Sequence, residues 1–137
     1  AFGFRCDCGS GYDFSFSGIK TAVLYKVQGL KKIYGTLTPD TIADLCASFQ
    51  ETVVCDLVAK SIKAALGAKI LVVGGGVAFN NYLREKLQIA AVQHKIRLCI
   101  APKTYCLDNA AMVASLGLRL FGKNGPKRSL RLDSLAA

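Results

Sequence analysis

An apolar run that ends in three consecutive glycines constrains this chain more than any other feature. Residues 71–73 are apolar, residues 74–76 are glycines, and Asn80 and Asn81 precede an amphipathic run. This order predicts a strand, a tight turn and the start of a helix. Because glycine lacks a Cβ atom and the first N–H groups of a helix are unpaired, a nucleotide phosphate or ribose can approach the backbone there.

The glycine turn by itself leaves two interpretations open. It is either a ligand-binding turn or a plain tight connection between a strand and a helix. The sequence contains neither the G-x-G-x-x-G motif nor the G-x-x-x-x-G-K-[ST] motif, so the choice depends on the rest of the chain.

Hydrophobic periodicity predicts further helices and strands on both sides of this turn. Ser17 is expected to cap the first helix, Thr38-Pro39 to begin the second, Gly67 to end it, and Gly122 to close the last. The predicted helices cover residues 18–32, 39–66, 80–91 (beginning at 79 or 80) and 108–120, and the predicted strands cover residues 13–17, 69–73 and 96–100.

The second half of this pattern alternates strand and helix, which predicts an α/β fold with a parallel sheet. Ligands of such sheets bind at the carboxyl ends of the strands. Two loops leave such ends here, the glycine turn and the loop that ends at Asp108, so we expect them to face one cleft. The expected organisation is an irregular segment over 1–12, one domain over 13–122 and a basic tail over 123–137.

Six cysteines are placed in a way that disfavours disulfides. Cys46 and Cys55 lie nine residues apart in one predicted helix, about half a turn out of phase, and Cys99 lies in a predicted strand. Reduced thiols are typical of the cytoplasm, which is the expected location. Cys6-Asp7-Cys8 lacks the paired ligands of a zinc site, and the single histidine, His94, is expected at an exposed helix end.

Eighteen Lys and Arg against nine Asp and Glu leave a formal charge of +9. Such an excess favours an anionic partner such as nucleic acid, and the alternative is a solvated basic surface. Apolar runs are well short of the ~20 residues that cross a bilayer, and no secretory signal is visible, so no membrane partner is expected.

Asp108 and Asn80 are the candidates for chemistry. Each lies where a strand-to-loop connection enters a helix, so each can either cap that helix or bind a ligand. Asn81 can cap as well as Asn80, which suggests that one of the two asparagines has another task.

Three motifs in order resemble the C-terminal half of the bacterial tRNA N6-adenosine threonylcarbamoyltransferase family, also described as O-sialoglycoprotein endopeptidase-like. They are Asp13-Phe14-Ser15-Phe16-Ser17-Gly18-Ile19-Lys20-Thr21, Gly74-Gly75-Gly76-Val77-Ala78-Phe79-Asn80 and Cys106-Leu107-Asp108-Asn109-Ala110-Ala111-Met112. Ala47-Ser48-Phe49-Gln50-Glu51 and Leu83-Arg84 also fit this family.

The resemblance implies one lobe of the actin-like ATPase and sugar kinase fold. The implied reaction transfers a threonylcarbamoyl group from its adenylate to N6 of adenosine 37 in tRNAs that read codons beginning with A. Asn80 would bind the adenylate, Gly74 and Gly75 would lie along its adenosine, and Asp108 would be a ligand of an iron or zinc ion. Ser15, Ser17 and Lys20 belong to a signature whose chemical role stays open. The implied partners are tRNA and the sister subunits of a modification complex.

The chain departs from the family pattern where the N-terminal lobe is concerned. The H-x-x-x-H motif that supplies the family's other metal ligands is absent, as are the phosphate-side loops of the first lobe. Phe79 replaces a residue that is commonly small. We therefore expect an incomplete half that is inactive alone, and the alternative is a noncatalytic actin-like partner module that scaffolds such a complex.

Overall fold

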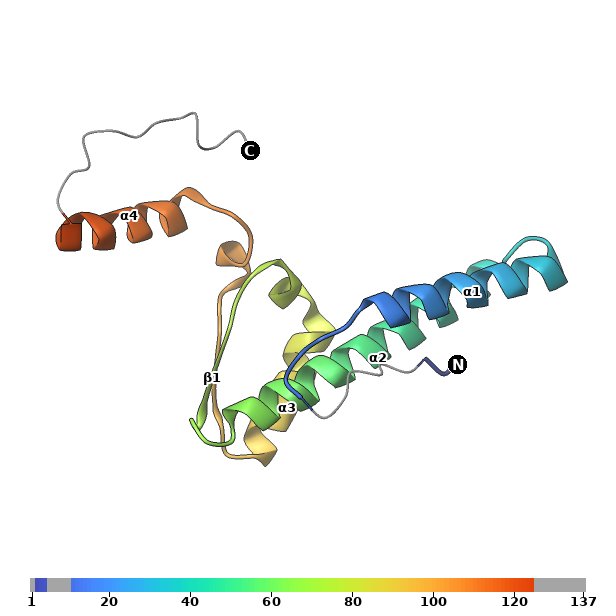
Figure 1. Cartoon of the computed structure of the whole chain (residues 1–137), viewed down its shortest axis with the longest axis horizontal. Helices are drawn as coiled ribbons and strands as arrows, with labels where there is room; N and C mark the ends of the chain where they lie inside the picture. The colour runs from blue at the N-terminus through green and yellow to red at the C-terminus, as the bar shows by residue number, and fades with distance from the viewer. Residues whose placement is uncertain (1, 5–10, 125–137) are drawn as a thin grey trace.

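The computed structural model describes residues 2–4 and 11–124 of the 137-residue chain. Two long helices come first, followed by strand, helix, strand and helix (Figure 1). They are α1 (Ser17–Tyr34), α2 (Pro39–Ala65), β1 (Ile70–Val73), α3 (Asn81–Gln93), β2 (Arg97–Ile100) and α4 (Ala110–Asn124), and the short 3-10 helices η1 (Gly76–Phe79) and η2 (Lys103–Tyr105) follow the two strands. The predicted α/β class is confirmed.

β1 and β2 pair side by side in parallel. Val73 lies opposite Ile100, and the N–H of Ala101 donates to the C=O of Val73 at 2.9 Å, which closes the ladder. Because the strands are parallel and in register, the loops that follow them leave from the same edge of the sheet. The predicted parallel β-α-β arrangement is therefore confirmed.

The core lies between this sheet and the two helices α2 and α3. Leu71 and Leu98 are partners in register and pack against both clusters of buried residues, which lie on α2 and α3 and just before β2. These clusters comprise Ile62, Ala65, Ala91 and Ile96, and Val54, Leu83 and Leu87. The other side of β1 is open, because Val72 is 74% exposed.

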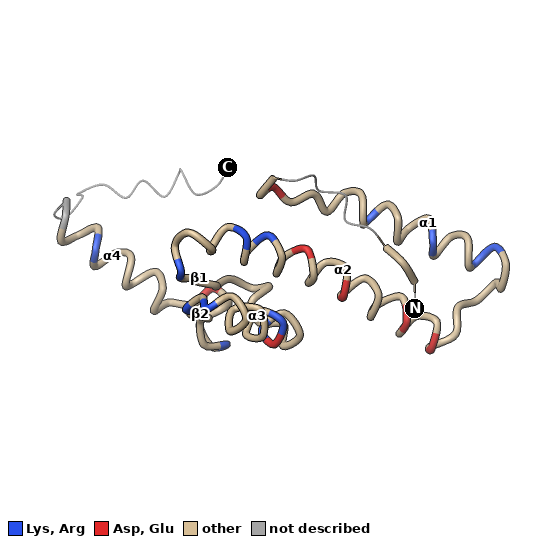
Figure 2. The backbone as a smooth tube through the Cα atoms, turned by 90° about the horizontal axis from the view of Figure 1, so that it is seen from below, with Lys and Arg blue, Asp and Glu red and all other residues tan. Residues whose placement is uncertain are grey.

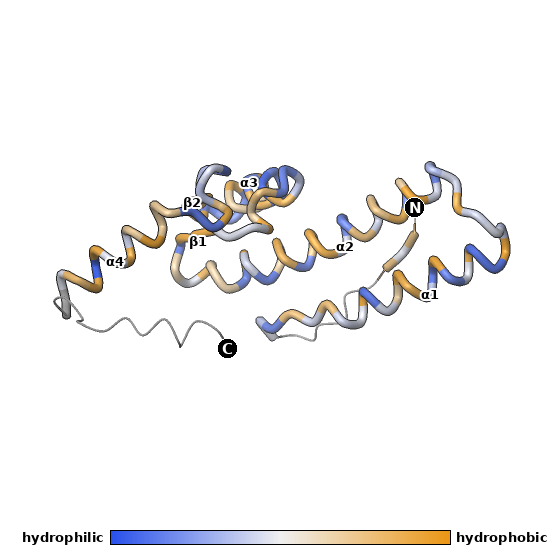
Figure 3. The backbone as a smooth tube through the Cα atoms, turned by 90° about the horizontal axis from the view of Figure 1, so that it is seen from above, coloured by the Kyte–Doolittle hydropathy of each residue, from blue (hydrophilic) through white to orange (hydrophobic). Residues whose placement is uncertain are grey.

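The two ends of the molecule extend away from this core (Figure 1). α1 and the first half of α2 lie side by side as a helical hairpin, and α4 projects in the opposite direction. Apolar residues continue along α4 (Figure 3), and Val113, Leu116 and Phe121 are all more than half exposed.

The start of α2 agrees with the sequence prediction, and the start of α1 differs from it. Thr38 caps α2, because its Oγ1 accepts a hydrogen bond from the N–H of Thr41 at 3.2 Å. The prediction that Ser17 caps α1 is wrong. Ser17 is already the first helical residue and its hydroxyl pairs with that of Ser15 at 3.2 Å, while Phe16 takes the cap position without a side-chain hydrogen bond.

Two glycines do not end helices as predicted. α2 ends at Ala65, and Lys69 rather than Gly67 takes the left-handed conformation, with its N–H bonded to the C=O of Ala65. α4 continues through Gly122 to Asn124, since a glycine weakens a helix by only about 1 kcal/mol relative to alanine. The first two residues of the predicted basic tail are thus helical, and the remainder lies outside the described residues.

The predicted strand over residues 13–17 is also wrong. Residues 13–16 have no regular secondary structure, and no strand in the described part of the chain pairs with them. The alternating pattern does place Phe14 and Phe16 on one side, where their rings stack with centroids 5.9 Å apart. The Nζ of Lys60 donates to the C=O of Asp13 at 2.7 Å, which holds this segment against α2.

Cys46, Cys55, Cys99 and Cys106 are free thiols, and Cys6 and Cys8 lie outside the described residues. Across the described ranges, no helix combines the length and apolar character needed to cross a membrane.

Candidate functional site

The glycine turn connects β1 to η1 and is exposed. Gly75 has φ +87° and ψ 171°, a conformation that essentially only glycine adopts. A Cβ atom on Gly74 or Gly75 would meet no atom within 4 Å. The backbone therefore requires glycine at 75 for its own geometry, and the space above both residues is open to a ligand.

Asn80 is the cap of α3. Its Oδ1 accepts a hydrogen bond from the N–H of Leu83 at 3.0 Å, and its Nδ2 donates to Oε1 of Gln50 on α2, also at 3.0 Å. Asn81 is the first helical residue. The capping role thus belongs to the asparagine that the sequence also singled out for ligand binding.

Asp108 does not cap α4, although its position suggested that it could. The cap is Asn109, whose Oδ1 accepts a hydrogen bond from the N–H of Met112 at 2.9 Å and whose Nδ2 donates to the C=O of Leu107. Asp108 is exposed, and in the part of the chain that the structure describes its carboxylate makes no hydrogen bond or ion pair. The carboxylate is therefore available to a ligand.

The two loops meet at the carboxyl edge of the sheet. Leu107, next to Asp108, approaches within 3.6 Å of the position that a Cβ atom on Gly76 would take. The Nζ of Lys103 lies 5.0 Å from the ring centroid of Phe79, a second contact between the loops. The structure thus brings the glycine turn and the Asp108 loop together, as the parallel topology predicts.

Arg84 lies between these loops. From α3 its Nε donates to the C=O of Ala78, and its Nη2 donates to the C=O of Ala101 at 2.6 Å and lies 3.1 Å from Sγ of Cys106. Sequence reasoning included Leu83-Arg84 in the family resemblance but assigned Arg84 no role. Sequence patterns carried no signal for this position, because the carbonyl groups that Arg84 contacts lie in two separate loops.

The 13–21 motif borders a cavity of about 550 Å³ that also reaches η1, directly after the glycine turn. Ile19 and Lys20 line it from α1, Phe49 from α2, and Val77 from η1. The structure therefore places this motif beside the turn, while Ser15 and Ser17 lie at the exposed start of α1.

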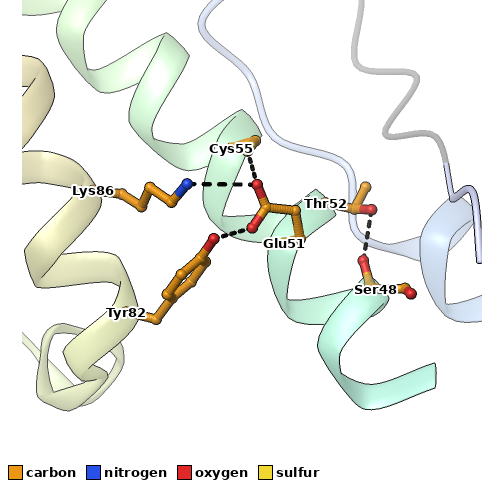
Figure 4. A network of polar contacts seen from close by, with 6 residues as sticks. All are labelled: Ser48, Glu51, Thr52, Cys55, Tyr82 and Lys86. Atoms are coloured by element: carbon orange, nitrogen blue, oxygen red, sulfur yellow. Dashed lines mark hydrogen bonds and ion pairs between the residues drawn. The ribbon is translucent and has the colours of Figure 1, made fainter. Parts of the chain in front are cut away.

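A polar network joins α2 to the start of α3 (Figure 4). The hydroxyl of Tyr82 and the thiol of Cys55 donate to the carboxylate of Glu51, and the Nζ of Lys86 lies 3.7 Å from the same carboxylate. The hydrogen bond from Tyr82 is the main reason that the pKa of Glu51 lies below its usual value, and the same bond raises the pKa of Tyr82. This network orients α3 next to the Gln50–Asn80 contact.

The described residues do not form a metal site by themselves. No group of three or more His, Cys, Asp or Glu side chains that could hold a metal ion occurs among them. A single carboxylate at Asp108 supplies one or two of the four to six ligands that zinc or a hard divalent cation takes. His94 ends α3, at the start of β2 rather than at its carboxyl edge.

A parallel β-α-β unit with an open glycine turn and a free carboxylate at one edge is an arrangement typical of ligand-binding α/β proteins. The sequence profile of the TsaD family, tRNA N6-adenosine threonylcarbamoyltransferase, matches residues 2–115. The chain belongs to this family, and its fold is therefore that of the actin-like ATPases.

The relatives that match carry the same family name. Proteins named tRNA N6-adenosine threonylcarbamoyltransferase are 51% identical over 104 residues in Nostoc punctiforme, 46% over 116 residues in Thermosipho africanus and 45% over 132 residues in Dictyoglomus turgidum. These matches cover 74%, 82% and 95% of this chain but 29%, 33% and 38% of the respective relatives. The chain thus spans about a third of the length of these relatives.

Proposed function

We propose that this chain is the adenylate-binding C-terminal lobe of a transferase that modifies tRNA. The proposed reaction moves a threonylcarbamoyl group from threonylcarbamoyl-adenylate to N6 of adenosine 37 in tRNAs that read codons beginning with A. Family membership and the names of the relatives support this class of reaction. The observation that carries the assignment is the carboxylate of Asp108, which is left free because Asn109 caps α4 and which belongs to the loop that meets the glycine turn.

The glycine turn and Asn80 would bind the adenylate. The open backbone at Gly74 and Gly75 lets the adenosine lie against it without a side chain in the way. The side-chain amide of Asn80 has two N–H donors, and Gln50 uses one of them. The second donor is left for the substrate, so Asn80 can cap α3 and bind the adenylate together.

The transfer itself requires a nucleophile from the tRNA and a leaving group on the adenylate. The N6 nitrogen forms a bond to the carbamoyl carbon, the bond from that carbon to the phosphate oxygen breaks, AMP leaves with the electron pair, and N6 loses a proton. Asp108 would contribute one carboxylate ligand to an iron or zinc ion, which would act as a Lewis acid when bound. The remaining ligands and the opposite wall of the cleft would come from a second lobe, so we expect this chain to be inactive alone.

The basic surface would bind the phosphates of tRNA. Lys and Arg occur along α1, at the end of α2 near the strands and on α3 and α4, whereas the acidic residues of α2 are spread over its first two thirds (Figure 2). Such cations release counterions from a nucleic acid on binding, which predicts an affinity that falls with salt. The basic tail beyond α4 lies outside the described residues.

The test uses Asp108→Asn in the intact transferase that carries this chain. The readouts are transfer of the threonylcarbamoyl group to a tRNA transcript and the metal content of the purified enzyme. We expect transfer and bound metal to be lost while the melting temperature is unchanged, because Asp108 is not a cap. Glu85→Gln on the exposed side of α3 is the matched control and should retain both. Full transfer and full metal content in Asp108→Asn would refute the role of Asp108, and robust turnover by the 137-residue chain would refute the two-lobe requirement.

A further inference from the structure

Arg84 connects the two loops of the candidate site through backbone oxygen atoms. Its Nε donates to Ala78 in η1, which follows β1, and its Nη2 donates to Ala101, which follows β2. Arg84 itself lies on neither loop but on α3, one turn after Asn80. The N–H of Arg84 itself donates to the C=O of Asn80 at 3.2 Å, so both side chains start from the same helical turn.

The surroundings of the guanidinium favour a fixed position. Ala78 is 2% exposed and Cys106 is 3% exposed, and the thiol of Cys106 lies 3.1 Å from Nη2. A guanidinium is planar and presents its donors at fixed angles, so it can hold two carbonyl groups at a set spacing. A lysine in this place would have one ammonium group at the end of a flexible chain and would not define that spacing.

The guanidinium connects the two chain segments just beyond the last hydrogen bond between β1 and β2. The last ladder bond joins the N–H of Ala101 to the C=O of Val73, and beyond it the two chains separate into different loops. Gly74 and Gly75 lie on one side of this separation and Asp108 lies on the other. Arg84 spans the separation just past the point where pairing stops.

We propose that Arg84 is a positioning residue that sets the distance between the glycine turn and the Asp108 loop. This inference rests on the proposed function, since it assumes that the two loops bind opposite parts of one adenylate. With the guanidinium in place, the adenosine held on the glycine turn is aligned with the carboxylate at Asp108. Without the guanidinium, each loop keeps its own residues, but the distance between the two loops is no longer fixed. Displacements of about 1 Å cost on the order of 100-fold in rate.

The experiment compares Arg84→Lys and Arg84→Gln with the unaltered enzyme in the intact transferase, with its partner subunits present. Arg97→Lys is the matched control, because Arg97 is an exposed arginine at the other end of β2. The measurements are kcat and KM for threonylcarbamoyl-adenylate at saturating tRNA, KM for tRNA, and the melting temperature. We expect kcat/KM for the adenylate to fall about 100-fold in Arg84→Gln and about 10-fold in Arg84→Lys. KM for tRNA should stay within about twofold, and Arg97→Lys should match the unaltered enzyme.

The outcomes distinguish a failure of the proposed function from a failure of the proposed role of Arg84. No transfer by the unaltered enzyme overturns the proposed function and, with it, this inference. Normal transfer by the unaltered enzyme together with unchanged kcat/KM in Arg84→Gln overturns the inference alone. If both Arg84 variants fail to fold, or if their loss of rate follows a loss of folded protein with an unchanged KM for the adenylate, Arg84 serves the stability of the fold and the inference is overturned as well.

Discussion

Replacing Asn80 with alanine removes both hydrogen bonds of its side chain. The cap to the N–H of Leu83 is 3.0 Å long, and loss of an asparagine cap costs about 1 kcal/mol. The exposed bond to Gln50 adds about 0.5 kcal/mol, because Oε1 of Gln50 can turn to water when its partner is gone. We therefore expect Asn80→Ala to lower the free energy of unfolding by about 1.5 kcal/mol.

Asn80→Asp separates the cap from the amide donor. The aspartate retains an oxygen for the N–H of Leu83, and a negative charge at a helix N-terminus contributes about 0.3–1 kcal/mol. This gain offsets the lost bond to Gln50, so we expect a stability within about 0.5 kcal/mol of the unaltered chain. The donor proposed for the adenylate is lost, so binding of the adenylate by the intact transferase should weaken about tenfold or more.

Stability is measured by urea unfolding of the 137-residue chain followed by circular dichroism, and adenylate affinity by titration calorimetry on the intact transferase. Asn81→Ala is the matched control, since Asn81 is exposed and begins the helix without capping it. Equal destabilisation by Asn80→Ala and Asn80→Asp would refute the capping argument. Unchanged adenylate affinity in Asn80→Asp would refute the role of the amide in binding.

Three further changes test other parts of the structure. Lys60→Met leaves the carboxylate of Asp56, 15% exposed and 3.4 Å from Nζ, without its cation, so urea unfolding should show a loss of about 3 kcal/mol. Adding Asp56→Asn should recover the part due to the unpaired carboxylate but not the part due to the lost hydrogen bond to the C=O of Asp13. The pKa of Glu51 is lowered by the hydrogen bond from Tyr82, so the stability that this bond supplies is present above the usual glutamate pKa of about 4.3 and is lost as the pH falls through the lowered pKa. Glu51→Gln should flatten that part of the profile of urea midpoint against pH, and an unchanged profile would contradict this explanation. Asn109→Ala removes the cap of α4 and should cost the first turn of that helix about 1 kcal/mol, so amide hydrogen exchange there should become faster by the corresponding factor. Asp108→Ala should leave the exchange rate unchanged.

Features with local signals could be predicted from the sequence. Thr38-Pro39 combines a good cap with a residue that suits the first helical position, and α2 begins there. The short apolar runs at β1 and β2 flank a helix of one crossover length, which favours the parallel pair that is observed. The adjacency of the glycine turn and the Asp108 loop followed from that topology alone.

Other features depend on choices between equivalent neighbours. Asp108 and Asn109 both cap helices well, and only the backbone conformation decides which of them does so. Ser17 was expected to cap α1 for the same reason, but the helix already includes it. Periodicity cannot resolve a difference of one residue at a helix end.

Long-range contacts were beyond the reach of sequence patterns. Lys60 is only 8% exposed because it reaches the C=O of Asp13, which lies 47 positions away along the chain. Arg84 likewise contacts loops on both sides of it, and its role depends on where those loops end up. A helical pattern marks such residues as polar and assigns them to solvent, because the partners that satisfy them are not neighbours in sequence.

The in-register pairing of β1 with β2 restricts how the length of this chain can vary. Inserting one residue into either strand would turn Leu71 or Leu98 away from the helices and shift the following loop along the strand by about 3.3 Å. The turn around His94 and Lys95, at the opposite edge, can lengthen without moving either loop of the site. Tags, labels and natural insertions should therefore be tolerated at that turn and rejected within the strands.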